Sequence, residues 1–195
     1  PMVRISDSTL CFSNCVFLRN SGLAIMDAQQ SDLHLVRCEF RRNAGTAFMV
    51  GVLTEADVTD SLFVGNQAFQ GGAVYHLGQA LNLRNSTLAD NGAVQSGGGI
   101  FHAKGTLSIT NSILWNNRTG GRMADSIEAQ QVWESDGPPS VVAYSLVQGL
   151  SQYAGNNNFA YDPLFLAADQ GIYTLNASSP AINSGTTNVL VADQR

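Results

Sequence analysis

Five asparagines recur at nearly constant intervals along the first part of the chain, and this recurrence constrains the fold more than any other feature. The intervals between them are 23, 23, 25 and 26 residues. A unit of roughly 23 residues with two or three short strands cannot bury a core alone, whereas stacked copies of such a unit can. The closing asparagines of the repeat are Asn20, Asn43, Asn66, Asn91 and Asn117.

Apolar residues alternate with polar ones before each closing asparagine. In the fourth repeat they are Leu81, Leu83 and Leu88, with the small Ser86 between the two strands. A period of two is typical of a strand with one buried face. A second apolar strand begins seven or eight residues earlier in each repeat, and we expect its residues to stack as one wall of the core. These residues are Val3, Ile25, Phe48, Val74 and Ile100.

The repeat length separates the candidate architectures. Leucine-rich repeats need a different leucine spacing and usually a helix, and propeller blades need four strands and about 40 residues. The sequence therefore predicts an all-β, right-handed parallel β-helix of five to seven coils. We expect coils in residues 1–150, with an irregular insertion near 118–140 that contains a short strand near Ile127. Residues 151–195 are expected to form a closing segment of the same domain, and the chain reads as a fragment of a longer protein.

Equivalent residues of neighbouring coils should lie about 4.8 Å apart. We therefore expect the closing asparagines to bond to one another and to the backbone at a corner of the coil. Cys15 and Cys38 also occupy equivalent positions, close enough for a disulfide. Later repeats place Ser61, Ser86 and Ser112 there. We favour a reduced pair of small residues, with a disulfide as the alternative.

Composition excludes two classes of partner. Charged residues make up 13% of the chain, the net charge is −5, and lysine and arginine are scattered. A nucleic-acid partner is therefore not expected. No apolar run approaches the roughly 18 residues of a membrane span, so we expect no membrane insertion by this segment. We also expect no cofactor.

Two short motifs carry a family resemblance. Three segments match the pattern FxxN: Phe17–Asn20, Phe40–Asn43 and Phe63–Asn66. The pattern GGA[ILV] is matched by Gly71–Val74 and nearly matched by Gly97–Ile100. Paired motifs of this kind resemble the repeats of polymorphic outer-membrane proteins and related bacterial β-helix adhesins. The resemblance implies a fold of the pectin-lyase-like superfamily on an exported bacterial protein, with an extracellular or cell-surface location.

The C-terminal part carries a second resemblance. Three of its segments are similar to the closing region of secreted bacterial β-helix proteins of the choice-of-anchor type. They are Asp162–Phe165, Tyr173–Leu175 and Ser179–Ile182. Together the two resemblances cover most of the chain. They are specific for the fold, because the motifs describe structural positions.

The resemblance also directs a search for catalytic groups. Enzymes of this superfamily that cleave acidic polysaccharides cluster carboxylates on an exposed face. Asp57 and Asp60 have no acidic equivalents in neighbouring coils, and no carboxylate partner can be assigned to Arg37 or Arg84. We expect the acidic residues of the insertion to form a solvated loop rather than a metal site. They are Asp125, Glu128, Glu134 and Asp136.

We therefore assign no catalytic, cofactor-binding or metal-binding residue. The expected function is a non-enzymatic structural or adhesive β-helix module of an exported protein, with a polysaccharide or a host or cell-surface molecule as partner. The alternative is a polysaccharide lyase or glycoside hydrolase of the pectin-lyase-like superfamily, or a fragment of one.

An apolar row beside the core wall is the first candidate ligand contact. Met26, Met49, Tyr75 and Phe101 alternate with the predicted core positions, so their side chains should point outward. An exposed apolar row usually marks a contact surface. Ligand contact and packing under a loop or a partner chain are equally good interpretations.

His76 and His102 follow this row at equivalent positions in two coils and should stack. They could bind a ligand or act as a general base, but two histidines without a third ligand rarely hold a metal. We favour a coincidence at the strand end, where other coils carry Ile5, Asp27 and Val50. The candidate ligand contacts of the chain are Met49, Tyr75, His76, Phe101 and His102.

Overall fold

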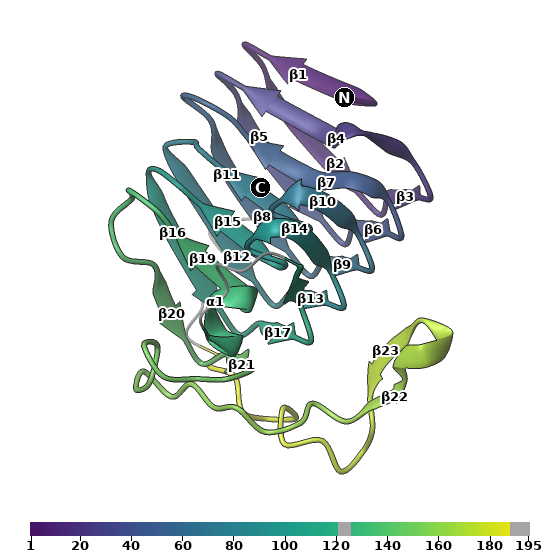
Figure 1. Ribbon diagram of the computed structural model, residues 1–195, viewed down its shortest axis with the longest axis vertical. Coiled ribbons are helices and arrows are strands. Elements are labelled where there is room, and N and C mark those ends of the chain that lie inside the picture. Colours follow the sequence, from purple (N-terminus) through teal and green to yellow (C-terminus); the bar gives the residue numbers. More distant parts are fainter. Residues whose placement is uncertain (121–125, 188–195) are drawn as a thin grey trace.

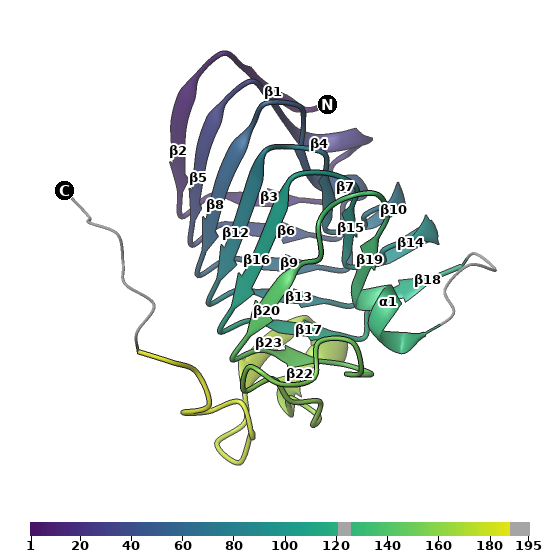
Figure 2. The same cartoon turned by 90° about the vertical axis from the view of Figure 1, so that its left-hand side faces the viewer.

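The computed structural model describes residues 1–120 and 126–187. The chain winds through stacked coils, and each coil adds one strand to each of three parallel sheets (Figures 1 and 2). Sheet B consists of β2 (Thr9–Ser13), β5 (Asp32–Val36), β8 (Glu55–Thr59), β12 (Ala80–Arg84), β16 (Thr106–Thr110) and β20 (Val141–Ala143). Sheet C consists of β3 (Val16–Leu18), β6 (Glu39–Arg41), β9 (Leu62–Val64), β13 (Thr87–Ala89), β17 (Ile113–Trp115) and β21 (Leu146–Val147).

Sheet A contains two groups of strands. The first group forms the third wall of the solenoid: β1 (Val3–Ser6), β4 (Ser21–Gln29), β7 (Ala44–Val50), β11 (Val74–His76), β15 (Ile100–His102) and β19 (Val132–Glu134). The second group, which we call the flange, projects beyond that wall (Figure 2): β10 (Gln67–Gln70), β14 (Gly92–Ser96) and β18 (Arg118–Thr119). Gly71 and Gly97 have φ values of 59° and 62°, a conformation that favours glycine, and they return the chain from the flange to the wall.

This architecture confirms the predicted parallel β-helix. Sheets B and C each contain six described strands, which agrees with the expected five to seven coils. The coils resume after the insertion, because β20 pairs with β16 and β21 pairs with β17.

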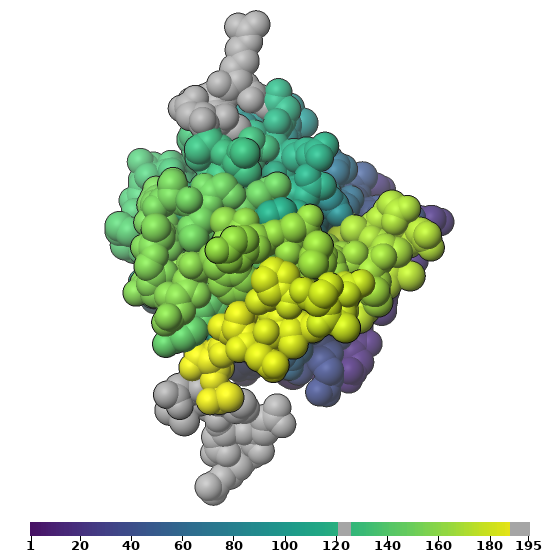
Figure 3. Space-filling model, turned by 90° about the horizontal axis from the view of Figure 1, so that it is seen from below, coloured from purple at the N-terminus to yellow at the C-terminus, as the bar shows by residue number. Residues whose placement is uncertain are grey.

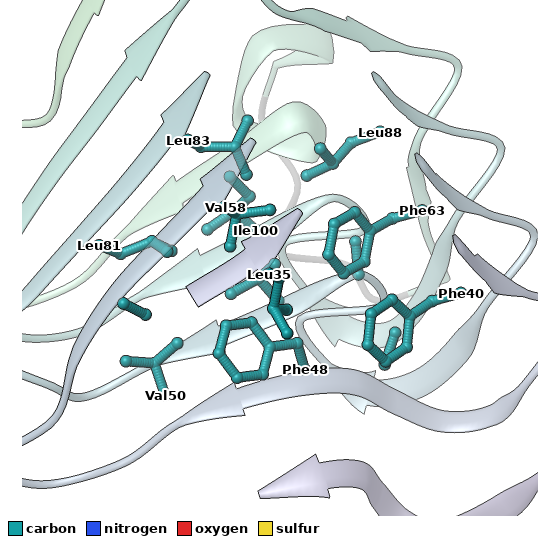
Figure 4. Close-up of a cluster of buried hydrophobic side chains, with 14 of the residues drawn as sticks. Leu35, Phe40, Phe48, Val50, Val58, Phe63, Leu81, Leu83, Leu88 and Ile100 are labelled. Carbon is teal, nitrogen blue, oxygen red and sulfur yellow. The ribbon is translucent and has the colours of Figure 1, made fainter. Parts of the chain in front are cut away.

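The core fills the space between the three sheets. Phe17, Phe40 and Phe63 stack with ring centroids 4.6 and 4.9 Å apart, and Leu88 continues the same column (Figure 4). Each of these four side chains is at most 8% exposed. In the first coil Leu10 stays 41% exposed, because no described residue stacks on its outer side. Stacking between coils, rather than packing within one coil, therefore buries the core.

The closing asparagines form the predicted ladder. The Oδ1 atom of Asn66 accepts hydrogen bonds from the backbone N–H and the side-chain amide of Asn43, at 3.1 and 2.7 Å. The side-chain amide of Asn66 donates to the carbonyl of Phe40 and to Oδ1 of Asn91, each at 2.9 Å. The same pattern runs from Asn20 to Asn117. At the far end the Oε1 atom of Gln131 takes the place of a sixth asparagine.

One position of the predicted core wall is wrong. Met26, not Ile25, pairs with Val3 and Phe48. The register of β4 against β7 shifts between Ser21 and Ala24, so the alternation read from the sequence is displaced by one residue in this coil. Met26 is therefore buried in the core instead of pointing outward, and Ile25 is buried beside it.

The expected short strand near Ile127 is also wrong. Residues Ile127–Gln131 form the helix α1, and the strand β19 follows it at Val132–Glu134. The Oγ atom of Ser126 accepts a hydrogen bond from the N–H of Ala129 at 3.0 Å and caps the helix. The helix brings Gln131 to the end of the asparagine ladder. Asp125, part of the expected acidic loop, lies outside the described residues.

The closing segment covers the end of the last coil, as Figure 3 shows from that end. Tyr153 is 8% exposed and joins the core, and Phe159 bridges to Leu146. The segment then leaves the end and forms an antiparallel hairpin, β22 (Phe165–Ala167) and β23 (Ile172–Leu175), joined by the 3₁₀ turn η1 (Ala168–Gln170). Because Arg41 in β6 donates to the carbonyl of Gly171 at 2.9 Å, this hairpin lies against the side of the solenoid.

The cysteines of the chain are free in the structure, as the favoured interpretation held for Cys15 and Cys38. Cys38 is buried, and burial raises the pKa of its thiol. Its Sγ lies 3.4 Å from the carbonyl oxygen of Phe12 in the preceding coil, to which the thiol donates. Both cysteines thus act as small residues in the column that later coils fill with serine.

Candidate functional site

The apolar row on the outer face of sheet A begins one coil later than the sequence predicts. Because β4 is displaced by one residue, the row starts with the charged pair Arg4 and Asp27 and not with Met26. From the third coil it is apolar, and the structure adds a member that the sequence pattern missed, the ring of Trp133. The outer row is Met49, Tyr75, Phe101 and Trp133.

Two rings of the outer row, those of Tyr75 and Phe101, stack on each other. Tyr75 and Phe101 are nearly parallel, with centroids 5.0 Å apart, so each ring uses a face on its neighbour. Phe101 is only 8% exposed, whereas Met49, Tyr75 and Trp133 are half-buried. The row is therefore a packed ladder whose edges reach the solvent beside the flange.

The two histidines point into the solenoid. They pair with Val50 on one side and Glu134 on the other, and Ala28 rather than Asp27 occupies the equivalent position in the second coil. Both side chains are fully buried, and their rings stack as predicted with centroids 5.0 Å apart. A ligand outside the solenoid thus reaches neither imidazole without opening the wall.

The hydrogen bonds of the pair fix the tautomers. The Nε2 atom of His102 lies 3.2 Å from the carbonyl oxygen of Pro138, which can only accept, so Nε2 carries the proton. The Nδ1 atom of neutral His102 then accepts from Nδ1–H of His76 at 2.9 Å. The Nε2 atom of His76 is left as an acceptor without a partner among the described residues.

This geometry makes the protein sensitive to acid. Burial, and then the nearby His102, lower the pKa of His76 from 6.5 to about 3. Between pH 6.5 and pH 3 the folded state therefore binds fewer protons than the unfolded state. The contribution of His76 to the free energy of unfolding is complete above pH 6.5 and is lost as the pH falls toward 3. We expect a slope of at most about 1.4 kcal/mol per pH unit in this window.

Urea denaturation at several pH values between 7.5 and 4 checks the prediction. His76→Val is the matched variant, since Val50 fills the same position one coil away. The variant should lose stability less steeply than the wild type as the pH falls. Parallel curves for the two proteins would show that His76 does not cause the acid sensitivity.

Glu128 and Glu134 are not part of a solvated loop, which corrects the expectation for these two residues, whereas Asp136 is exposed as expected. Glu128 is 4% exposed, and its carboxylate accepts four hydrogen bonds of 2.8 to 3.1 Å from Ser151, Gln152 and Tyr153. Its carboxylate therefore fastens the closing segment to the helix.

Glu134 has a similar role. Burial pushes the pKa of its carboxyl up, but hydrogen bonds from Ser140, Gln152 and Tyr153 outweigh burial and lower the pKa. The phenol of Tyr153 donates to Glu134 at 3.0 Å, and burial together with this carboxylate raises the pKa of Tyr153. Within residues 1–120 and 126–187, no three histidine, cysteine, aspartate or glutamate side chains gather as metal ligands.

A polar row on the outer face of sheet B was missed at the sequence level. The guanidinium of Arg84 lies 3.5 Å from Asp57, so the expectation that Arg84 lacks a carboxylate partner is wrong. His34 lies 3.6 Å from the other oxygen of Asp57 and 3.7 Å from Asp32. All four side chains are partly exposed, and the distances are longer than those of ordinary hydrogen bonds. The equivalent positions of His34 and Asp57 were an available signal, whereas Arg84 lies two residues beyond the position that pairs with Asp57.

A cleft of about 630 Å³ lies along the flange, between β14, β18 and the corner after β13. The Asp90 carboxylate lies at its edge and accepts hydrogen bonds from Asn116 and, at 2.5 Å, from Tyr173. Burial and Asp90 raise the pKa of the Tyr173 phenol. Arg118 donates to Oδ1 of Asn116 at 2.8 Å. The cleft is therefore polar, open and already hydrogen-bonded.

Among the described residues, none of the helices combines the length and the apolar character that crossing a bilayer demands. No curated protein and no solved structure matches the chain. The model of one family, the right-handed β-helix region, matches residues 2–126, which is more than half of the chain. These residues hold the first five coils and the asparagine ladder, and the chain belongs to the right-handed β-helix region family.

Proposed function

We propose that this protein is a non-enzymatic structural module that presents binding surfaces to glycans as part of an exported, adhesive protein. The proposal rests on the location of the potentially catalytic carboxylate and imidazole side chains. Glu128, Glu134 and Asp90 are hydrogen-bonded within the chain, and His76 and His102 are sealed in the core.

A hydrolase needs a reachable carboxylate pair, one acting as acid and one as base or nucleophile. A lyase needs a base beside the sugar and a group that neutralises its carboxylate. Glu128 and Glu134 are occupied by donors from the closing segment, so neither can serve without unfastening that segment. The exposed edges of the outer row and the flange cleft are two surfaces that the molecule offers a polymer, and both are suited to contact rather than to bond cleavage.

Glycan contact at the outer row is part of this proposal. Because the rings of Tyr75 and Phe101 stack on each other, a sugar would contact their edges rather than an open ring face. The neighbouring strands of the flange supply polar backbone and side chains. The predicted partners, a polysaccharide or a host or cell-surface molecule, remain the proposed ones.

Two assays on one preparation test the proposal. A glycan array should show binding, and incubation with polygalacturonate and other uronate polymers should yield no new reducing ends and no unsaturated products. Tyr75→Ala should weaken array binding without changing the fold. Asp57→Asn is the matched variant on sheet B. Depolymerisation by the wild type that Asp57→Asn abolishes would overturn the proposal in favour of a polysaccharide-cleaving enzyme.

A further inference from the structure

A pocket of about 240 Å³ lies where the closing hairpin approaches the corner between sheet C and sheet A. One wall is the corner that follows β3 and β6, and the other is the tip of the hairpin. Its lining includes Leu18, Arg19, Arg41, Arg42, Gly65 and Gly171. The repeat thus brings arginines from two successive coils to one concave place.

The repeat explains how two of these arginines line up. Arg19 and Arg42 each precede a closing asparagine and share a left-handed backbone, with φ values of 53° and 52°. Gly65 holds the same position in the next coil, with a φ of 66°. A Cβ atom added to Gly65 would lie 3.4 Å from Cγ of Arg42. The missing side chain therefore leaves open space beside the stem of Arg42.

The hairpin completes the pocket by meeting two guanidinium groups. A Cβ atom added to Gly171 would lie 3.4 Å from Nη2 of Arg42 and 4.0 Å from Nη1 of Arg41. Arg41 is held in place, because it donates to the carbonyl of Gly171 and pairs with Glu39 at 2.5 Å. Both guanidinium groups therefore converge on the hairpin tip.

The charge of the pocket is left uncompensated. Glu39 is engaged by Arg41, and the Asp90 carboxylate near Tyr173 already accepts two hydrogen bonds. Within the described ranges, the backbone N–H groups of Arg19 and Arg42 donate to the next coil, but their guanidinium groups have no hydrogen-bond or ion-pair partner. A concave site lined by one sign of charge raises the local concentration of ions of the opposite sign. This site is positive although the chain carries a net charge of −5.

We propose that this arginine pocket binds an oxyanion carried by a glycan, namely a sulfate, phosphate or carboxylate group. Guanidinium groups match the geometry of such oxyanions and bind them through paired N–H donors. The volume is below the roughly 300–1,000 Å³ of pockets that enclose whole ligands. The pocket therefore takes one charged group or one sugar unit of a longer chain. The proposal rests on the proposed function, which it deepens by making the bound glycan anionic.

Isothermal titration calorimetry at low ionic strength tests the proposal with four probes. They are a sulfated heparin-type oligosaccharide, an oligogalacturonate, a neutral cello-oligosaccharide of equal length, and inorganic phosphate. We expect the anionic oligosaccharides to bind, the neutral one not to bind, and inorganic phosphate to compete weakly. A stronger response to free phosphate than to either anionic oligosaccharide would contradict the glycan as the source of the oxyanion.

Variants locate the site. Arg42→Gln should weaken binding of the anionic oligosaccharide about tenfold, and Arg19→Gln with Arg42→Gln about a hundredfold. Glutamine suits these backbones, as Gln30 adopts a φ of 50°. The control pair, Arg4→Gln with Arg37→Gln, removes the same charge outside the pocket and should change affinity less than about threefold.

The outcomes separate this proposal from the proposed function. Equal losses in both pairs of variants, or equal binding of the neutral oligosaccharide, would overturn the arginine pocket while a non-enzymatic binding module stands. Cleavage of oligogalacturonate by the wild type would overturn the non-enzymatic function. The pocket would still stand if binding of the anionic oligosaccharide depended on Arg19 and Arg42. A thermal melt of each variant, expected to match the wild type, confirms that exposed arginines were changed without unfolding the coils.

Discussion

Replacing Asn66 with alanine is expected to lower the free energy of unfolding by about 3–5 kcal/mol. Asn66 lies in the middle of the asparagine ladder and is fully buried. Its side chain accepts from Asn43 and donates to the carbonyl of Phe40 and to Asn91. Alanine leaves these groups without partners away from water, and each such group costs about 1–3 kcal/mol.

The ladder makes the loss cooperative between coils. With Asn66 gone, neither the N–H nor the side-chain amide of Asn43 has an acceptor in the next coil. Urea denaturation followed by circular dichroism measures the effect. Asn82→Ala is the control, because the half-buried Asn82 side chain lies on the outer face of β12 and makes no hydrogen bond within the described residues. We expect a change within about 0.5 kcal/mol for the control, and similar losses in both variants would refute the structural role of the ladder.

Replacing Phe40 with alanine is the second large expected loss, about 3–5 kcal/mol. The ring is fully buried and stacks between Phe17 and Phe63 at 4.6 and 4.9 Å. Alanine removes both stacking contacts and leaves a cavity between two coils that the parallel strands of sheet C hold in place. The column cannot collapse to fill that space without shifting the registers of β3, β6 and β9.

Leucine provides the matched comparison at this position. The fourth and fifth coils place Leu88 and Leu114 in the same column, so the fold accepts the smaller side chain there. Phe40→Leu should therefore cost less than half of what Phe40→Ala costs, as measured by urea denaturation. Equal losses for the two variants would mean that aromatic stacking, rather than filled volume, stabilises the column.

The fold could be predicted because its stabilising contacts repeat. Equivalent residues such as Asn43 and Asn66 meet one coil apart, so a pattern in the sequence is also a contact in space. The same logic gave the parallel registers of sheets B and C and the stacking of His76 on His102. Repetition links sequence distance to spatial distance, which a non-repetitive fold does not do.

Prediction failed where the repeat is interrupted. Because the register of β4 shifts by one residue, Met26 rather than Ile25 takes the core-wall position that pairs with Phe48. A shift of one residue reverses which side chains of a strand face the core. The helix at Ile127–Gln131 is five residues long, too short for an apolar period to show. The expected solvated loop failed because the donors to Glu128 lie more than 20 residues away, in the closing segment.

The arginine pocket could not be read from the sequence for the same reason. Arg41 and Gly171 are 130 residues apart, and no periodic pattern relates the hairpin to the coils. Arg19 and Arg42 share a repeat position, but only the hairpin turns that column into a concave site. The outer row on sheet A and the arginine pocket beside the hairpin share no residue and can be tested separately.

Calorimetry of a uronate or sulfated polymer titrated into the protein distinguishes a binding module from a polysaccharide-cleaving enzyme in one experiment. A binding module gives a heat pulse at each injection that decays to the baseline and disappears when the sites are full. An enzyme gives a displacement of the baseline that persists until the polymer is consumed. We expect saturating pulses with an unchanged baseline, and a sustained displacement that scales with protein concentration would contradict a non-enzymatic module.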